Sequence, residues 1–383
     1  MSDTTQRQTL EAMQILLAAR VPVLLWGDPG IGKTTTVERH AHAAGWATET
    51  VIASLHDPTD IGGLPVLTPA GVVLEPPAWA RRTAERDIDT LVFFDEINTA
   101  APATQNALMR VVLSGHVGDL DLGARARFAA AANPAAQNSG AWDLSAPLAN
   151  RFAHLSWPLS VDEWAAGYLA GWPEPEPPKC PEPDPARVSY HRAMQSAFIR
   201  RRPNLLCDVP DAFAATADDT AGGHGWPSPR TWERTAVCLA AADAADAHPD
   251  VAALITESLV GTAAAAEYLA FVSELDLPDP EALIADPASL VLPERPDQQL
   301  ACLHAVAAAI AEHNTPARWA KGFEVCIAAA RSDAPDIAMV AARTFAAIRP
   351  PRARLPEGHE LLNDVFLEEL DPDRQPLDPH TGT

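Results

Sequence analysis

Three glycines, a lysine and a threonine near the start of the chain have the spacing of an anion-binding loop. The residues run Gly27-x-x-x-x-Gly32-Lys33-Thr34 within the segment WGDPGIGKTTTVERH. Permissive residues let successive backbone N–H groups turn inward, so that the loop forms a nest for an anion. A lysine here reaches phosphate oxygens, and a threonine hydroxyl holds Mg²⁺. The spacing therefore predicts a loop that cradles the phosphates of a nucleotide.

The segments on either side of this loop support the same interpretation. The preceding run VPVLLW (residues 21–26) is short, apolar and rich in strand-forming residues, which is typical of a buried parallel strand. The following run KTTTVERHAHAAG predicts a helix that ends at Gly45. A strand, a glycine-rich loop and a helix, in that order, are the context that a phosphate-binding loop requires.

A second apolar run ends in two carboxylates. In LVFFDEIN, residues 91–94 predict another buried strand, and Asp95 and Glu96 follow at its carboxyl end, where open α/β sheets bind ligands. We expect Asp95 to order the water shell of Mg²⁺ and Glu96 to orient and deprotonate an attacking water. Alone, such a pair is also a common helix N-cap. The predicted contacts to ATP are Gly27, Asp28, Pro29, Gly30, Ile31, Gly32, Lys33, Thr34, Thr35 and Asp95, with Thr34 and Asp95 as the Mg²⁺ ligands.

From Gln8 to about Leu275 the sequence resembles the AAA+ ATPases, and within them the MoxR-like branch. FAAAANP resembles the sensor 1 strand, which implies that the amide of Asn133 positions the attacking water. LSAPLANRFAHL resembles the arginine-finger segment, which implies that Arg151 reaches into the site of a neighbouring subunit. WPSPRTWER is similar to the sensor 2 motif, which implies that Arg230 contacts the γ-phosphate of its own subunit.

Each of these three residues also has an ordinary interpretation. Asn133 precedes a proline and is a good turn residue. Arg151 is also consistent with a surface ion pair of little energetic weight. Arg230 follows Pro229 in what the sequence predicts to be a first helical turn, where it would be solvated. The order and spacing of the motifs favour the functional interpretation.

Two predicted hairpins interrupt the core. In SLHDPTDIGGLPVLTPAGVVLEPPAWARR, glycines and prolines bound the short apolar runs LPVL and VVLE, which predicts a hairpin. It resembles the helix 2 insert of the MoxR-like group, which projects towards the central pore of a ring. SGHVGDLDLGARARF predicts a companion hairpin with Gly118 and Asp119 near its turn. The alternative is a surface excursion without contact to substrate.

The predicted fold class is α/β: a P-loop NTPase parallel sheet core of the AAA+ αβα type, followed by an all-α lid and a C-terminal helical region. We predict three parts. Residues 1–158 form the nucleotide-binding core with its hairpin inserts. Residues 159–275 form the lid, with a proline-rich loop at 172–185 that cannot be helix or central strand. Residues 276–383 form the helical region and end in a frayed acidic tail.

Composition excludes several classes of protein. The net charge of −23 argues against a sequence-blind nucleic-acid binder. No basic segment followed by an apolar one opens the chain, and no apolar run approaches the roughly 20 residues of a membrane span. The five cysteines are scattered and never spaced as CxxC, which is typical of reduced thiols and predicts a cytoplasmic protein without structural zinc. The spacing of the histidines indicates neither a metal site nor an acid–base site.

These observations and the resemblance give one hypothesis and two alternatives. The hypothesis is an ATP hydrolase, active as a homo-oligomeric ring, expected to be a hexamer, that remodels or assembles a partner protein. The family association implies that this partner carries a von Willebrand A domain. One alternative is an ATP-gated scaffold whose hydrolysis is incidental, and the other is a DNA-remodelling or clamp-loading ATPase, which the charge disfavours.

Overall fold

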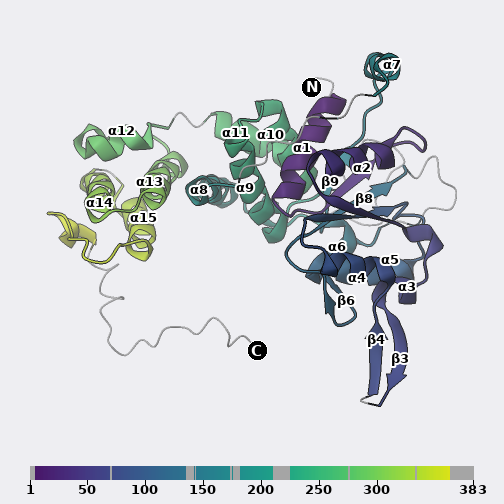
Figure 1. Cartoon of the computed structure of the whole chain (residues 1–383). Coiled ribbons are helices and arrows are strands. Elements are labelled where there is room, and N and C mark those ends of the chain that lie inside the picture. Colours follow the sequence, from purple (N-terminus) through teal and green to yellow (C-terminus); the bar gives the residue numbers. More distant parts are fainter. Residues whose placement is uncertain are drawn as a thin grey trace. The chain divides into compact units, whose positions relative to one another are not determined.

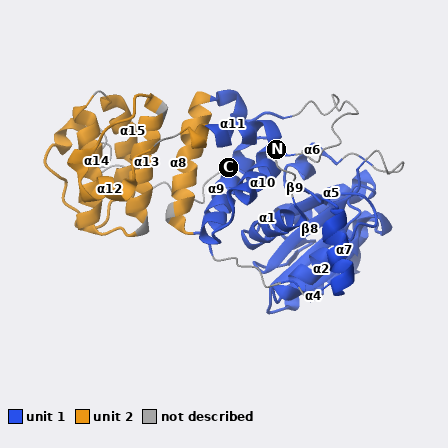
Figure 2. Ribbon diagram, turned by 90° about the horizontal axis from the view of Figure 1, so that it is seen from above, with its two compact units in different colours: residues 1–183, 202–270 blue, residues 184–201, 271–383 orange. Residues whose placement is uncertain are grey.

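The computed structural model of the chain describes residues 5–69, 71–134, 142, 144–172, 175, 182–209, 225–274, 277–332 and 334–362. The chain divides into two compact units, one of residues 1–183 and 202–270 and the other of residues 184–201 and 271–383 (Figure 2). The first unit holds every residue of the predicted site. Each unit has its own hydrophobic core and is described by itself below.

A five-stranded parallel sheet is the centre of the first unit. The strand order is β2-β5-β8-β1-β9, and every neighbouring pair is parallel. Because helices cover both faces, the strands read as continuous apolar runs, of which VLLW and TLVFFD are examples. The strands are β1 Val23–Trp26, β2 Ala47–Ile52, β5 Thr90–Asp95, β8 Ala126–Ala132 and β9 Ala153–Ser156.

Helices sandwich this sheet (Figure 1). On one face lie α1 (Gln6–Ala18) and α2 (Lys33–Ala43). On the other face lie α3 (Pro58–Gly62), α4 (Ala78–Glu85), α5 (Pro102–Ser114) and α6 (Ala146–Ala149). Alternate strand residues point to opposite faces, so one set of strand side chains, such as Leu24, Val92 and Phe94, packs into a single cluster with Leu108 and Leu148 from the second group of helices. The predicted α/β sheet core of the P-loop type is confirmed.

Both predicted hairpins are present. β3 (Leu64–Thr68) pairs antiparallel with β4 (Gly71–Glu75), and the pair projects away from the sheet (Figure 1). β6 (His116–Val117) pairs antiparallel with β7 (Leu120–Asp121), with the turn at Gly118 and Asp119 as predicted. Gly118 has φ +58, and a Cβ atom there would come within 2.9 Å of Leu74 Cβ, so a larger residue would not fit.

Further helices of the first unit follow the sheet in sequence. α10 contacts α1, α9 and β9, so this helical part packs directly on the sheet domain. The N-cap of α9 is Ser228, whose hydroxyl accepts from the backbone of Thr231. The elements are the 3₁₀ turns η1 Ala53–Leu55 and η3 Pro203–Leu206 and the helices α7 Val161–Ala170, α9 Pro229–Ala244, α10 Pro249–Val260 and α11 Thr262–Ser273.

The second unit is entirely helical in its described residues. All five described α-helices of this unit begin with proline at the first turn, where the missing N–H costs no hydrogen bond. Trp319 stacks on Phe323, which meets Phe345 edge-on in the middle of the core. The elements are α8 Pro185–Arg201, α12 Pro280–Ala285, η4 Pro287–Ser289, α13 Pro296–Glu312, α14 Pro316–Arg331, α15 Pro335–Ala347 and η5 His359–Leu362.

The structure divides into two compact units and not along the three predicted parts, and the first unit joins the predicted core to most of the predicted lid. Helix α8, expected within the lid, packs against α13 and belongs to the second unit. The boundaries at residues 158 and 275 stay predictions. Most of the predicted proline-rich loop (172–185) and the whole predicted acidic tail lie outside the described residues.

The described helices and cysteines bear on two of the predictions made from composition, those on membrane spans and on thiols. No described helix is long and apolar enough to cross a membrane. Four of the five cysteines lie in described residues and are free thiols: Cys207, Cys238, Cys302 and Cys326.

Candidate functional site

The predicted phosphate loop leaves β1 and enters α2. Gly30 and Gly32 have φ of +82 and +89, in the left-handed region that glycine adopts without strain. Gly27 has a different reason to be glycine, because a Cβ atom there would lie 2.7 Å from Ile31 Cδ1 and 3.3 Å from the backbone oxygen of Trp157. The loop is thus a tight cradle that only these small residues allow.

Lys33 begins α2 and points back into this loop. Its Nζ donates to the backbone oxygens of Gly27 (2.6 Å) and Asp28 (2.9 Å) and to Oδ1 of Asn133 (3.0 Å). The side chain is buried, and this burial lowers the pKa of the Lys33 ammonium although the carboxylates of Asp95 and Asp28 oppose the shift. The ammonium therefore lies at the centre of the loop.

Thr34 and Asp95 bring two oxygen ligands together. Thr34 Oγ1 donates to Asp95 Oδ2 at 2.7 Å, which joins the first turn of α2 to the end of β5. A hydroxyl and a carboxylate are hard oxygen donors, and Mg²⁺ in nucleotide sites is held by one or two such groups together with substrate phosphates and water. The pair fits this ion. The described residues contain no group of three or more His, Cys, Asp or Glu side chains that could hold a metal ion.

Glu96 has a strained backbone. Its φ is +54, in the left-handed region that is uncommon for a residue with a side chain. Its backbone N–H donates to Asp95 Oδ1 at 2.9 Å, and Ser54 Oγ donates to its carboxylate at 2.8 Å. Ser54 follows β2, so the end of a third strand controls the orientation of the predicted base.

Asn133 directly follows β8 and contacts Lys33 through its side chain, as described above. A second asparagine holds its backbone: Asn98 Nδ2 donates to Asn133 O at 2.7 Å, and Asn133 N donates to Asn98 Oδ1 at 3.3 Å. Asn98 is 3% exposed. This pair of bonds fixes the end of β8 relative to the loop after β5 and so positions the Asn133 amide.

Arg151 and Arg230 lie at the other edge of the sheet. Arg151 immediately precedes β9, at the amino edge where the strands begin, whereas the phosphate loop lies at the carboxyl edge where they end. Arg230 Nη1 donates to Oδ1 of Asn150 at 3.1 Å, and the Ser228 hydroxyl donates to the same oxygen. The four residues of β9 span about 13 Å. The structure therefore groups Arg230 with Arg151 and not with Lys33, which disagrees with the predicted contact of Arg230 to its own nucleotide.

A third arginine joins these two. Arg234 lies one helical turn after Arg230, and its Nη1 donates to the backbone oxygen of Arg151 at 2.5 Å. Burial, reinforced by the charge of Arg230, lowers the pKa of Arg234 to about 10, and the same two causes lower the pKa of Arg151. We call Arg151, Arg230 and Arg234 the arginine cluster.

The arginine cluster has the character of an anion site. No ion pair joins its three guanidinium groups to a carboxylate in the described part of the chain. Two buried donors beside it, Asn150 Nδ2 and Arg151 Nε, have no hydrogen-bond partner among the described residues. Arg151 Nη1 donates to the backbone oxygen of Pro147 in the preceding helix. Concentrated positive charge with unsatisfied donors favours the binding of an anion.

The structure thus brings most of the predicted site together. Lys33, Thr34, Asp95, Glu96 and Asn133 lie at one edge, on loops that follow three neighbouring strands. Sequence reasoning did not find Ser54, Asn98 and Arg234. Arg234 alone left a signal, because it follows Arg230 by four residues on a predicted helix and so shares its face.

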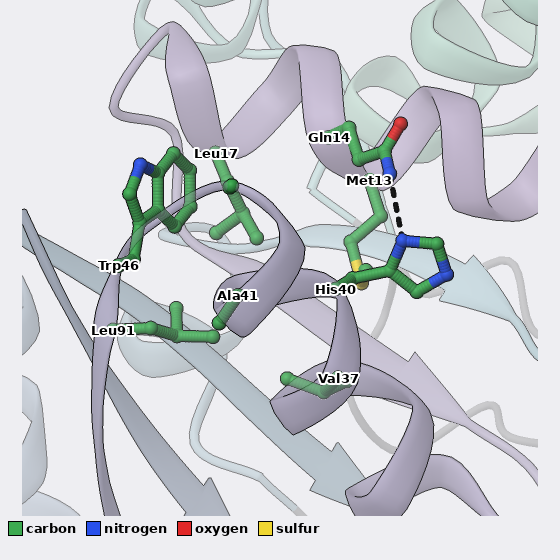
Figure 3. Close-up of a pocket in the computed structure, with 9 residues that line it drawn as sticks. Met13, Gln14, Leu17, Val37, His40, Ala41, Trp46 and Leu91 are labelled. Atoms are coloured by element: carbon green, nitrogen blue, oxygen red, sulfur yellow. Dashed lines mark hydrogen bonds between the residues drawn. The ribbon is translucent and has the colours of Figure 1, made fainter. Parts of the chain in front are cut away.

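A small apolar pocket lies elsewhere, between α1, α2 and the sheet (Figure 3). Met13, Leu17 and Val37 line it, and Gln14 hydrogen-bonds to the ring of His40 at 2.8 Å. None of the predicted site residues contributes to it. Because it is small and apolar, we interpret it as a packing gap in the core and not as a substrate site.

The fold and the loop define the class of the domain as a P-loop nucleotide-binding domain. Residues 22–152 match the family model of the AAA domain, dynein-related subfamily. The chain therefore contains an AAA domain, the nucleotide-binding module of AAA+ ATPases. No curated protein matches the sequence.

Two solved structures are similar in part. A proposed ATPase from Cytophaga hutchinsonii is 13% identical with a TM-score of 0.45, over 72% of this chain and 91% of that one. A full-length MCM homologue from Methanopyrus kandleri is 19% identical with a TM-score of 0.39, over 71% of this chain. This chain spans 56% of the MCM homologue. Similarity at this level does not bear on function.

Proposed function

We propose that the protein is a MoxR-like AAA+ ATPase that hydrolyses ATP with Mg²⁺ at the subunit interfaces of a ring. The observation that carries the proposal is the hydrogen-bonded group at the carboxyl edge of the sheet. In this group the Lys33 ammonium donates hydrogen bonds to the glycine loop and to the Asn133 side chain, and the Thr34 hydroxyl donates to Asp95. A passive structural loop does not require these four side chains to converge.

The residues of this edge divide the chemical work. The amides of the loop and Lys33 bind the phosphates, and Lys33 exchanges its carbonyl partners for phosphate oxygens when ATP enters. Mg²⁺, held by Thr34 and Asp95, would neutralise charge on the phosphate oxygens. Glu96 accepts a proton from the attacking water, which Asn133 orients. Such reactions depend on positioning and charge stabilisation, which fixed side chains supply.

The arginine cluster completes a site on the next subunit. Arg151 is separated from its own phosphate loop by the length of β9, which supports action in trans. Arg230 and Arg234 belong to the same cluster, so we assign all three to the γ-phosphate of the neighbour. This replaces the expected contact of Arg230 within its own subunit. A trans arginine of this kind accelerates phosphoryl transfer by about 10³ to 10⁵.

A head-to-tail arrangement of this type gives a ring when the rotation between subunits closes. We propose a hexamer that uses ATP turnover to remodel or assemble a partner protein, with the β3–β4 hairpin directed at the substrate. The hairpin supports this role because it exposes apolar side chains on both strands, including Leu67 and Val72. The resemblance to MoxR-like proteins implies a partner with a von Willebrand A domain.

Two variants test the proposed reaction. Glu96→Gln should bind a fluorescent ATP analogue as the wild type does and should hydrolyse no ATP, since only the proton acceptor is lost. Lys33→Ala should lose both binding and turnover. Steady hydrolysis by purified Glu96→Gln protein, with the Lys33→Ala preparation as the contamination control, would exclude Glu96 as the base. Proteins that co-purify with ATP-loaded Glu96→Gln identify the partner.

A further inference from the structure

Helix α7 carries a row of large apolar side chains on its surface. Val161, Trp164, Tyr168, Leu169 and Trp172 recur at helical spacing, and none of the residues of α7 is buried. Leu169 is 86% exposed and Val161 is 77% exposed. We call these five side chains the α7 stripe. Surface helices normally turn such a stripe towards a core, but no element in the described part of the chain covers this one.

The stripe is an ordered feature of the fold. Trp164 stacks on Tyr168 with ring centroids 5.1 Å apart. After the helix, Gly171 (φ +69) turns the chain back, and the ring of Trp172 packs so closely on Gly167 that a Cβ atom there would come within 2.3 Å of it. These contacts hold the aromatic side chains in place before any partner binds, which lowers the entropic cost of docking.

The stripe lies on the side of the molecule that carries the phosphate loop. β9 ends at the carboxyl edge of the sheet, and α7 begins only a few residues later. Arg39 of α2 donates to the backbone oxygen of Trp172 at 2.6 Å. Helix α2 itself starts at the phosphate loop, and Figure 1 draws α7 above α2, on the same side of the sheet. A subunit that brings arginines to this nucleotide site must therefore approach the stripe.

The charges on α7 indicate which kind of partner surface can cover the α7 stripe. The first turn of α7 carries Asp162 and Glu163, and the helix contains no lysine or arginine. Helices that lie on membranes are usually rich in basic residues on their polar face, so a lipid surface is a poor match. The amino edge of a second copy of the chain fits better, because it carries the arginine cluster and exposes Leu113 at the end of α5.

We propose that the α7 stripe docks on the arginine-bearing edge of a second copy of this chain. The contact would couple assembly of the ring to completion of the ATP site, because the surface that buries the stripe also delivers the arginine cluster. This inference rests on the proposed function, since it needs a ring with shared sites. It adds the surface that holds two subunits together.

The test combines Trp164→Ser and Leu169→Ser in the Glu96→Gln protein, which is expected to retain ATP. Both side chains are exposed, so the fold should tolerate the change. The control is Val291→Ser, which removes an exposed apolar side chain from the second unit. Sedimentation velocity with Mg-ATP should show rings for the parent and the control and monomers for the stripe variant, while all three bind the ATP analogue within about threefold of one another.

The outcomes separate the two proposals. If the parent forms rings and the stripe variant forms them equally well, the docking proposal is wrong and the proposed function stands. If the parent stays monomeric with ATP bound, the ring itself is refuted. Leu169→benzoylphenylalanine should photo-cross-link to a second copy, and exclusive cross-linking within one chain would contradict the proposal. Flotation of the parent protein, but not the stripe variant, with phosphatidylserine vesicles would instead identify a lipid surface as the occupant.

Discussion

Mixing two inactive variants should restore ATP hydrolysis if the arginine cluster acts on a neighbouring subunit. Arg151→Ala removes an arginine but leaves the phosphate loop and Glu96 intact. Glu96→Gln removes the base but leaves the arginine cluster intact. At an interface where Glu96 comes from the first variant and Arg151 from the second, a complete site forms again.

The expected recovery follows from the geometry. About 13 Å of β9 separates the amino edge, where Arg151 lies, from the carboxyl edge, where its own phosphate loop lies. In rings mixed at random from equal amounts, about one interface in four pairs the two intact halves. Each single variant should have lost about 10³-fold or more in turnover. The mixture should therefore regain about a quarter of the wild-type rate, far above either parent.

The assay is steady-state phosphate release after co-denaturation or extended incubation with ATP, with subunit exchange verified by fluorescence energy transfer between labelled variants. Arg151→Lys is the matched variant that keeps the charge but loses the forked geometry, and it should recover only partly. Full exchange without recovery would refute action in trans.

The same assay tests the reassignment of Arg230. A mixture of Arg151→Ala and Arg230→Ala should stay inactive, because both arginines must come from one edge of one subunit. If Arg230 instead served its own nucleotide, this mixture would recover about a quarter of the activity. Recovery of activity would therefore support the contact between Arg230 and the nucleotide of its own subunit, as the sequence predicted.

Three other perturbations have defined outcomes. Gly27→Ala should weaken ATP binding by about tenfold or more in a fluorescence titration, since a Cβ atom collides with the loop, whereas Gly62→Ala, with open space around it, should not. Asn98→Ala should lower the free energy of unfolding by about 2 kcal/mol in urea and reduce kcat more than it changes KM. Burial lowers the pKa of His40 from 6.5 to about 4, so the unfolded state binds more protons between these values and stability falls as pH falls through that window. His40→Gln should remove about 2 kcal/mol of this pH dependence.

Each of these three has a contrary result. Equal affinity of the Gly27 and Gly62 variants would mean that the loop relaxes around the methyl group. Loss of stability without loss of kcat in Asn98→Ala would make that residue purely structural. An unchanged slope of unfolding free energy against pH in His40→Gln would mean that other groups set the acid sensitivity.

The sequence predicted those parts of the site that depend on local order along the chain. The phosphate loop, the acidic strand end and both hairpins were confirmed as elements, because spacing and turn residues determine such features within short segments. Ser54 and Asn98 were missed since each acts through a partner that is distant in the sequence. The grouping of Arg230 with Arg151 was not predictable for the same reason: its motif resembles a sensor, but its hydrogen bond to Asn150 depends on how the start of α9 lies against the residues before β9.

Strand β9 extends from the arginine cluster at its amino end to the phosphate loop near its carboxyl end. Its amino end carries Arg151, and just past its carboxyl end Trp157 donates to Trp26 at 2.7 Å and packs against Gly27. Under the proposed function, a single strand therefore joins the nucleotide loop of its own subunit to the arginines offered to a neighbour.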